Sequence, residues 1–166
     1  MAKKKSKKQT SKYAFLVAVI FGLLAVASIF LPSVKSVGKI GGAEDTFTGI
    51  QTAFGYKEST EILGSTITTE ILKINLFSLL AYALPLVGVV LLVLFKNAKI
   101  FNFISFGAFV ASCVFAFLSI TTFPATVIGS ELTSLLIEYS LGFGAILCGV
   151  LSGIAGLATL VKLLKK

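Results

Sequence analysis

The chain has 166 residues, of which 56% are hydrophobic and only 13% are charged, and its mean hydropathy is +0.98. Soluble domains are about 45–50% apolar and about 25% charged, so this composition excludes a disordered chain, a collagen-like fibre, a disulfide scaffold and a water-soluble globule. The net charge is +8, and all fifteen basic residues are lysines. The sequence therefore predicts an integral membrane protein.

Several residue types needed for common chemistries are missing. The chain has no His, Arg or Trp, which excludes imidazole acid-base chemistry and imidazole metal ligation. The two cysteines, Cys113 and Cys148, lie in apolar runs and lack the spacing of a metal or redox motif. We predict no catalytic residue, no metal ligand and no cofactor. Lysine is the only basic residue type, and Phe and Ile are abundant, a usage that resembles the codon bias of an AT-rich genome. It favours a bacterial origin.

Four uncharged apolar runs cover residues 13–31, 74–95, 100–122 and about 139–161. A hydrocarbon core of about 30 Å needs roughly 20 helical residues, and each run is long enough. Because backbone groups in lipid must pair within their own segment, and no two-residue alternation indicates a barrel, we expect helices. The predicted fold is an all-α integral membrane protein, a four-transmembrane-helix bundle with a first outer loop of about forty residues at 33–73.

The lysines are distributed unevenly about these runs. One side holds eleven lysines and no acid, and the other holds four lysines against seven acids. By the positive-inside rule both termini are cytoplasmic and the first loop is extracytoplasmic. We divide the chain into a basic tail at 1–12 and one membrane domain at 13–166. The tail is expected to anchor at the membrane surface through six lysines: Lys3, Lys4, Lys5, Lys7, Lys8 and Lys12.

The first run also resembles a cleavable signal peptide, because small residues at 25–27 precede Ser28. The run continues to Leu31 and thus has spanning length, which favours its retention as the first helix.

The outer loop at 33–73 is longer than a hairpin needs, so we expect it to be functional or ordered against the bundle. Phe47, Ile50 and Phe54 fit a short amphipathic helix within residues 46–56. The stretch 65–73 is rich in β-branched residues and fits either a short strand or an outer extension of the second helix.

The second outer segment begins where Pro124 is expected to end the third helix. Ser130 is a good N-cap with Glu131 in the first turn, so we predict a fourth helix over 131–163 that projects beyond the membrane. Its outer turns would carry an apolar stripe of Leu132, Leu135, Leu136 and Tyr139. That stripe would either pack on the larger loop or recognise an external partner.

Small residues spaced every four positions predict helix contact faces in lipid. The fourth helix carries Ala145, Gly149, Gly153 and Gly156, and the third carries Ala108, Ser112 and Ala116. These faces would pack inside the bundle or dock a second copy or another membrane protein.

Two further features lie inside the spans. Pro85 should bend the second helix, with Ser78, Ala81 and Gly88 on its face. The bend would set the helix shape or form a gate. Cys113 and Cys148 are expected at similar depths in the membrane. They would either pack as free thiols or form a disulfide.

The spans contain no charged residue, which argues against a proton-coupled transporter. A Ser/Lys dyad, or Glu58 with Glu61, would be the only enzyme-like pairing, and no motif joins either, so we predict a non-enzyme. Lysines beside a membrane suit lipid headgroups, and we predict no nucleic-acid partner.

In span order, loop lengths and termini, most of the chain resembles the claudin-type tetraspan arrangement. The Trp and the cysteine pair of the claudin first loop are missing here. The segment from Phe47-Thr48-Gly49-Ile50 to Phe54-Gly55-Tyr56 resembles small bacterial membrane proteins of uncharacterised function. Neither resemblance implies a function.

Taken together, the sequence predicts a non-enzymatic, multi-pass protein of a bacterial cell membrane. We expect it to act by association, as an accessory or scaffold subunit of the cell envelope. Its partners would be membrane lipid and itself or another membrane protein. The alternatives are a small oligomeric channel or transporter component, and an immunity or stress protein.

Overall fold

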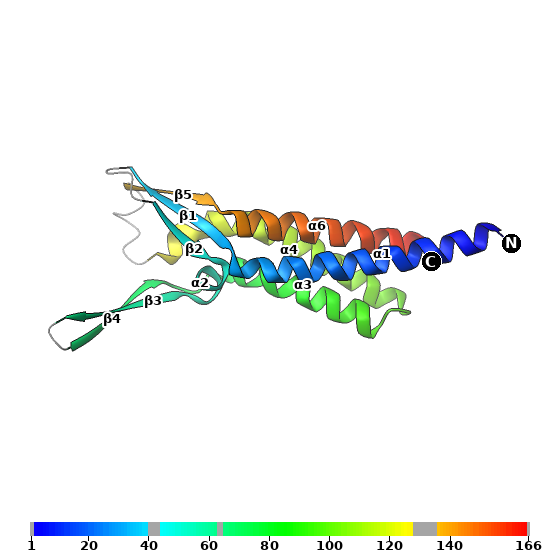
Figure 1. Cartoon of the computed structure of the whole chain (residues 1–166), viewed down its shortest axis with the longest axis horizontal. Coiled ribbons are helices and arrows are strands. Elements are labelled where there is room, and N and C mark those ends of the chain that lie inside the picture. Colours follow the sequence, from blue (N-terminus) through cyan, green and yellow to red (C-terminus); the bar gives the residue numbers. More distant parts are fainter. Residues whose placement is uncertain (1, 40–43, 63–64, 128–135, 166) are drawn as a thin grey trace.

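A computed structural model describes residues 2–39, 44–62, 65–127 and 136–165, and it is elongated, with helices at one end and strands at the other (Figure 1). Among the described residues, four helices are long and apolar enough to cross a membrane, as predicted. They are α1 (Ala2–Ala27), extended by the 3-10 turn η1 (Ser28–Phe30), α3 (Leu76–Leu94), α4 (Lys99–Thr126) and α6 (Phe143–Leu164).

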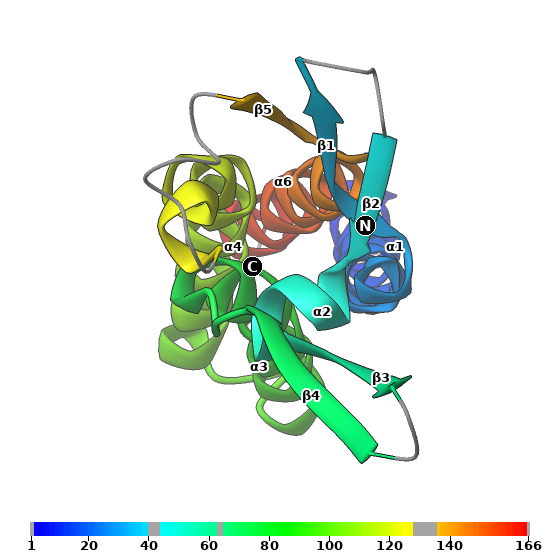
Figure 2. The ribbon, with the colours of Figure 1, turned by 90° about the vertical axis from the view of Figure 1, so that its left-hand side faces the viewer.

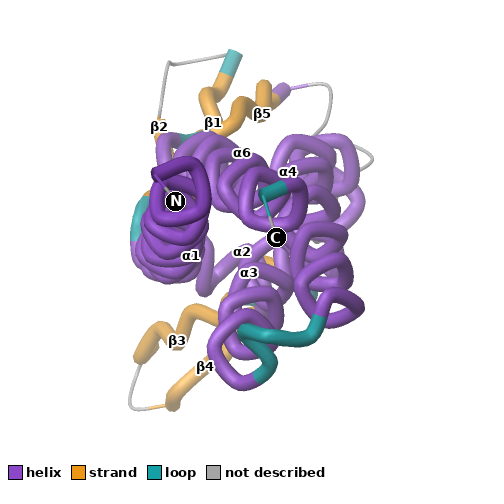
Figure 3. The backbone as a smooth tube through the Cα atoms, turned by 90° about the vertical axis from the view of Figure 1, so that its right-hand side faces the viewer, coloured by secondary structure: helices purple, strands orange, loops and turns teal. Residues whose placement is uncertain are grey.

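The four helices form a ring in which α1 and α4 each pack against both α3 and α6 (Figure 3). Both termini lie at the same end of the bundle, which we call the terminal end. The opposite end, where the strands lie, is the sheet end. This arrangement gives the up-and-down order expected of four consecutive membrane crossings.

The centre of the bundle is filled by Phe109 of α4, whose side chain is fully buried. A Cβ atom on Gly22 of α1 would lie 2.9 Å from the Phe109 ring, and one on Gly88 of α3 would lie 3.1 Å from it. Small residues on two helices thus make room for one aromatic ring. Ala18 and Ala155 belong to the same buried cluster.

A three-stranded antiparallel sheet stands on the bundle, with β1 (Pro32–Gly38) between β2 (Glu44–Thr48) and β5 (Ile137–Leu141). β1 follows α1 and β5 precedes α6, so the sheet extends two neighbouring helices beyond the bundle (Figure 2). Val34 of β1 faces Phe47 and Leu141 in register. With Phe123 and Leu72 it forms a second small core beneath the sheet.

The first outer loop continues through the helix α2 (Gly49–Phe54) into a hairpin of β3 (Tyr56–Ile62) and β4 (Ser65–Leu72). Thr48 caps α2: its backbone N–H donates to Gln51 Oε1 at 2.9 Å, and its hydroxyl accepts from the Gln51 N–H. The short helix predicted within 46–56 is present. The stretch 65–73 is a strand and not an extension of the second helix.

Two predictions about secondary structure are wrong. The protein is not all-α, because the described residues outside the bundle form five strands. The fourth helix does not run over 131–163: residues 137–141 are β5, and α6 begins at Phe143. In β5 the even positions, Glu138 and Ser140, are exposed while the odd positions are half-buried, a two-residue period that suits pairing with β1. Ser130, Glu131, Leu132 and Leu135 lie outside the described residues.

The predicted end of the third helix also needs correction. α4 continues through Pro124 to Thr126. Proline lacks an N–H, but only two helical residues follow it before the helix ends, and the Val127 N–H donates to the Pro124 carbonyl at 3.4 Å.

Candidate interaction surface

The predicted small-residue faces of α4 and α6 lie against each other in one copy of the chain. Ser112 of α4 donates its hydroxyl to the Ala81 carbonyl of α3 at 2.7 Å, and its oxygen lies 2.9 Å from Ser152 Oγ of α6. Gly153 is half-buried. The other residues of the two faces are buried: Ala108, Ser112, Ala116, Ala145, Gly149 and Gly156.

The structure also shows the environment of Pro85, of the two cysteines and of Tyr82, which lie inside the predicted spans. Pro85 is buried within α3, which is one helix on both sides of it, so the bend stays a prediction. Cys113 and Cys148 are free thiols. Cys148 is buried, and its thiol donates to the Ala81 carbonyl oxygen at an Sγ–O distance of 3.5 Å. The Tyr82 hydroxyl donates to Ser33 Oγ at 3.0 Å and joins α3 to β1.

Asn75 joins the helices at the sheet end, a role that the sequence reading missed. Its side-chain oxygen accepts from the N–H groups of Phe77 and Ser78 at 3.0 and 3.2 Å, which caps α3. Its side-chain nitrogen donates to the Ser119 carbonyl of α4 at 3.2 Å. An asparagine directly before an apolar run is an N-cap signal, and this signal could have identified it.

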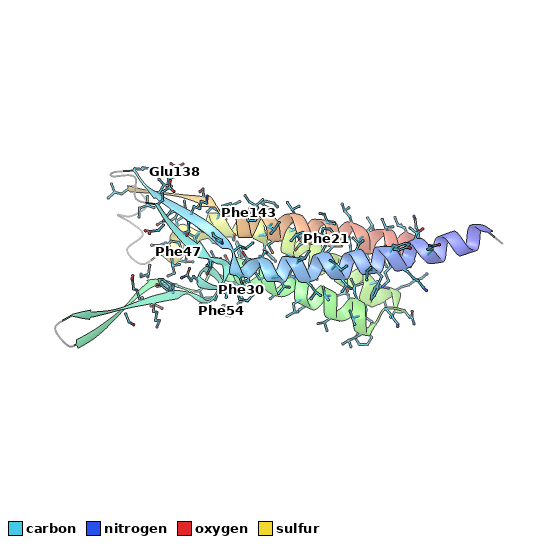
Figure 4. The ribbon with its side chains drawn as sticks, in the orientation of Figure 1. Phe21, Phe30, Phe47, Phe54, Glu138 and Phe143 are labelled. Atoms are coloured by element: carbon cyan, nitrogen blue, oxygen red, sulfur yellow. The ribbon has the colours of Figure 1, made fainter. Side chains whose placement is uncertain are left out.

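Exposed aromatic side chains lie at the junction between the bundle and the sheet end. Phe30, Phe54 and Phe143 are 70%, 59% and 60% exposed and lie where the helices give way to strands (Figure 4). Ile50 on α2 is exposed as well. Large exposed apolar residues of this kind are typical of surfaces that contact lipid.

The sheet end presents free strand edges. β2 pairs with β1 along one edge, and no other described strand pairs with it. The β3–β4 hairpin projects away from the three-stranded sheet (Figure 2), and at its base Leu72 of β4 forms a single antiparallel bridge with Val127. Its exposed side includes the ion pair of Lys57 and Glu70, with N and O 3.8 Å apart. Such edges are templates for pairing with another chain.

A cleft of about 280 Å³ lies between β2, α2 and the hairpin. Two carboxylates, Asp45 and Glu58, share its walls with apolar and neutral side chains. Asp45 comes from β2 and Glu58 from β3, and the short helix α2, which joins these two strands, brings them to the same cleft. The sequence showed that this side is acidic but gave no sign that these two residues converge. The full lining is Asp45, Thr46, Phe47, Gln51, Tyr56, Glu58 and Ile71.

The residues that could serve as metal ligands or as an enzyme-like pair do not come together in the described part of the chain. That part contains no group of three His, Cys, Asp or Glu residues that could hold a metal ion. Glu58 lies exposed on β3, and the side chain of Glu61 falls outside the described part. The chain matches no protein-family model and no curated protein sequence. The strand edges at the sheet end and the cleft beside them are therefore the candidate functional surfaces.

Proposed function

We propose that the chain is a non-enzymatic, multi-pass membrane protein that acts by association, as an accessory or scaffold subunit of the cell envelope. The observation that carries this proposal is the set of open strand edges at the sheet end. A two-stranded hairpin by itself is only marginally stable in water, and the β3–β4 hairpin packs on the molecule at its base through Leu72 while Lys57, Glu58, Ser59 and Glu70 are exposed. A partner that covers the hairpin would supply the missing packing.

The mode of association that fits is strand addition, in which an extended partner segment pairs with the free edge of β2 or β3. The cleft beside these edges would receive alternate side chains of that segment. Because Asp45 and Glu58 line the cleft, a segment with lysine or arginine at the matching position is favoured. The apolar residues Phe47 and Ile71 would contact its neighbours.

Purification of the tagged chain from native membranes in mild detergent, with mass spectrometry of accompanying proteins, tests the proposal. A stoichiometric partner that is retained by Glu138→Lys and lost by Glu58→Lys would support it. Both residues are exposed acids on strands at the sheet end, and only Glu58 lines the cleft. A lone monomer, or a partner lost equally in both variants, would refute association at this cleft.

The purification also separates the alternatives. A channel within one copy is disfavoured because Phe109 fills the bundle centre, so a pore would have to form between copies. A homo-oligomer that conducts ions in liposomes would favour the channel component. An immunity or stress role would instead appear as sensitivity of a deletion strain to an external peptide.

We further propose that both termini are cytoplasmic in a bacterial cell membrane, and that the likeness to claudin-type proteins is one of architecture. The lysine asymmetry about the spans supports this orientation. A cysteine placed at Glu58 in a cysteine-free background should react with a membrane-impermeant thiol reagent in intact cells, and one at Asn97 should not. Labelling at both positions would contradict the orientation.

A further inference from the structure

A second cavity, of about 350 Å³, lies at the terminal end, opposite the sheet. Three separate segments of the chain line it: the start of the first span, the turn between α3 and α4, and the last turn of α6. Each segment contributes one lysine, and the cavity volume is within the ~300–1,000 Å³ typical of ligand sites. The lining residues are Ser11, Lys12, Phe15, Lys96, Asn97 and Lys162.

Lys162 is held in place as part of the bundle. Its side chain is only 4% exposed, and Nζ donates to Asn102 Oδ1 on α4 at 2.9 Å. The same Nζ lies 4.7 Å from the centroid of the Phe15 ring on α1. Both contacts hold the Lys162 ammonium group in one position. The cavity therefore has a fixed cationic wall.

Three of the six residues that line this cavity are lysines, and none of the six is Asp or Glu. Residues 1–43, 71–130 and 139–166, which include every segment at the terminal end, contain no Asp or Glu. Lys12 and Lys96 are exposed and share the cavity with Lys162. Three ammonium groups around one cavity repel each other, and an anion bound among them would relieve that repulsion.

The depth of the cavity relative to the apolar spans indicates the source of the anion. Lys12 directly precedes the first apolar run, and Lys162 lies in the last turn of α6. Leu94 and Phe95, just before Lys96, are 68% and 41% exposed and offer an apolar surface for acyl chains. The lysines thus lie at the border of hydrocarbon and headgroups, where basic pockets between helices bind lipid phosphates.

We propose that this cavity binds the phosphate of an anionic phospholipid headgroup in the leaflet at the terminal end. Lys162 would be the fixed contact, and Lys12 and Lys96 would close on the phosphate from α1 and from the α3–α4 turn. The lipid would then join three segments of the bundle that the sequence places far apart.

The test uses the purified full-length chain, with binding of phosphatidylglycerol and phosphatidylcholine followed by native mass spectrometry. The informative variant is Lys12→Gln/Lys96→Gln, and the matched control is Lys99→Gln/Lys165→Gln. Each removes two exposed lysines from the terminal end, but only the first pair lines the cavity. Because both pairs are exposed, neither variant should disturb folding, which circular dichroism verifies.

We expect the wild type to prefer phosphatidylglycerol and the cavity variant to bind it about thirtyfold more weakly, equivalent to about 1 kcal/mol per lysine. The control should change binding by less than about threefold, since its lysines act only through screened charge. Equal losses in both variants, or equal binding of both lipids, would overturn the proposal. Inorganic phosphate that competes fully at millimolar concentration would identify a free-phosphate site and overturn the lipid assignment.

Discussion

Replacing Gly144 with alanine should destabilise the protein, because the new Cβ atom would clash with backbone carbonyl oxygens at the end of α1. Gly144 is the second residue of α6, and a Cβ there would lie 2.8 Å from the Leu31 carbonyl oxygen and 3.0 Å from those of Pro32 and Ser28. Close carbon–oxygen contacts are normally about 3.3–3.6 Å. The Leu31 carbonyl is fixed by the Gly49 N–H at 3.1 Å, so the backbones must separate.

Overpacking of this kind costs about 1–3 kcal/mol, and the higher helix propensity of alanine offsets at most about 1 kcal/mol of it. Gly153, on the same helix, provides the control. A Cβ there meets only the Cys113 sulfur, at 3.8 Å, which is an ordinary contact. Gly153→Ala should therefore be neutral or stabilising, and because the propensity gain is shared by both substitutions, the two variants should differ by about 1–3 kcal/mol in the free energy of unfolding.

The difference is measured by thermal unfolding in one detergent, followed by far-ultraviolet circular dichroism. At about 2–4 °C per kcal/mol for a chain of this size, the melting temperature of Gly144→Ala should lie about 2–12 °C below that of Gly153→Ala. If the two variants melt together, the close approach of α6 to the end of α1 does not constrain stability, and the reasoning fails.

Three smaller effects should appear in the same melts. Asn75→Ala removes the α3 cap and should cost about 1–3 kcal/mol, while Asn75→Asp keeps the cap and should cost less; equal losses would contradict the capping role. Ser112→Ala removes the hydrogen bonds to the Ala81 carbonyl and to Ser152 and should cost about 0.6 kcal/mol for each bond; an unchanged melting temperature would argue against these contacts. Tyr82→Phe removes the hydrogen bond to Ser33 and should cost about 1 kcal/mol; no change would show the bond contributes nothing.

The sequence by itself determined the parts of this protein that the membrane imposes. A helix in lipid must satisfy its own backbone groups, so an uncharged apolar run of sufficient length is enough to identify each span. The short helix at Gly49–Phe54 could also be predicted, because Phe47, Ile50 and Phe54 have the spacing of one helix face. The acidic character of the sheet end could be read directly from residue positions.

Only the tertiary structure decided what happens beyond the helices. The spacing of Leu136 and Tyr139 fits a helix face, whereas Ile137, Tyr139 and Leu141 fit a strand equally well. Pairing with β1, about a hundred residues earlier in the chain, favoured the strand, because α1 and α6 are neighbours and bring the two segments together.

The two cavities depend on the same kind of long-range placement. Asp45 and Glu58 converge across α2, and Lys12, Lys96 and Lys162 converge from three segments that are distant in sequence. No local pattern marks any of these residues as a member of a site. Their proximity follows from which helices pack together, and that is set by side-chain fit, such as the seat of Phe109 against Gly22 and Gly88.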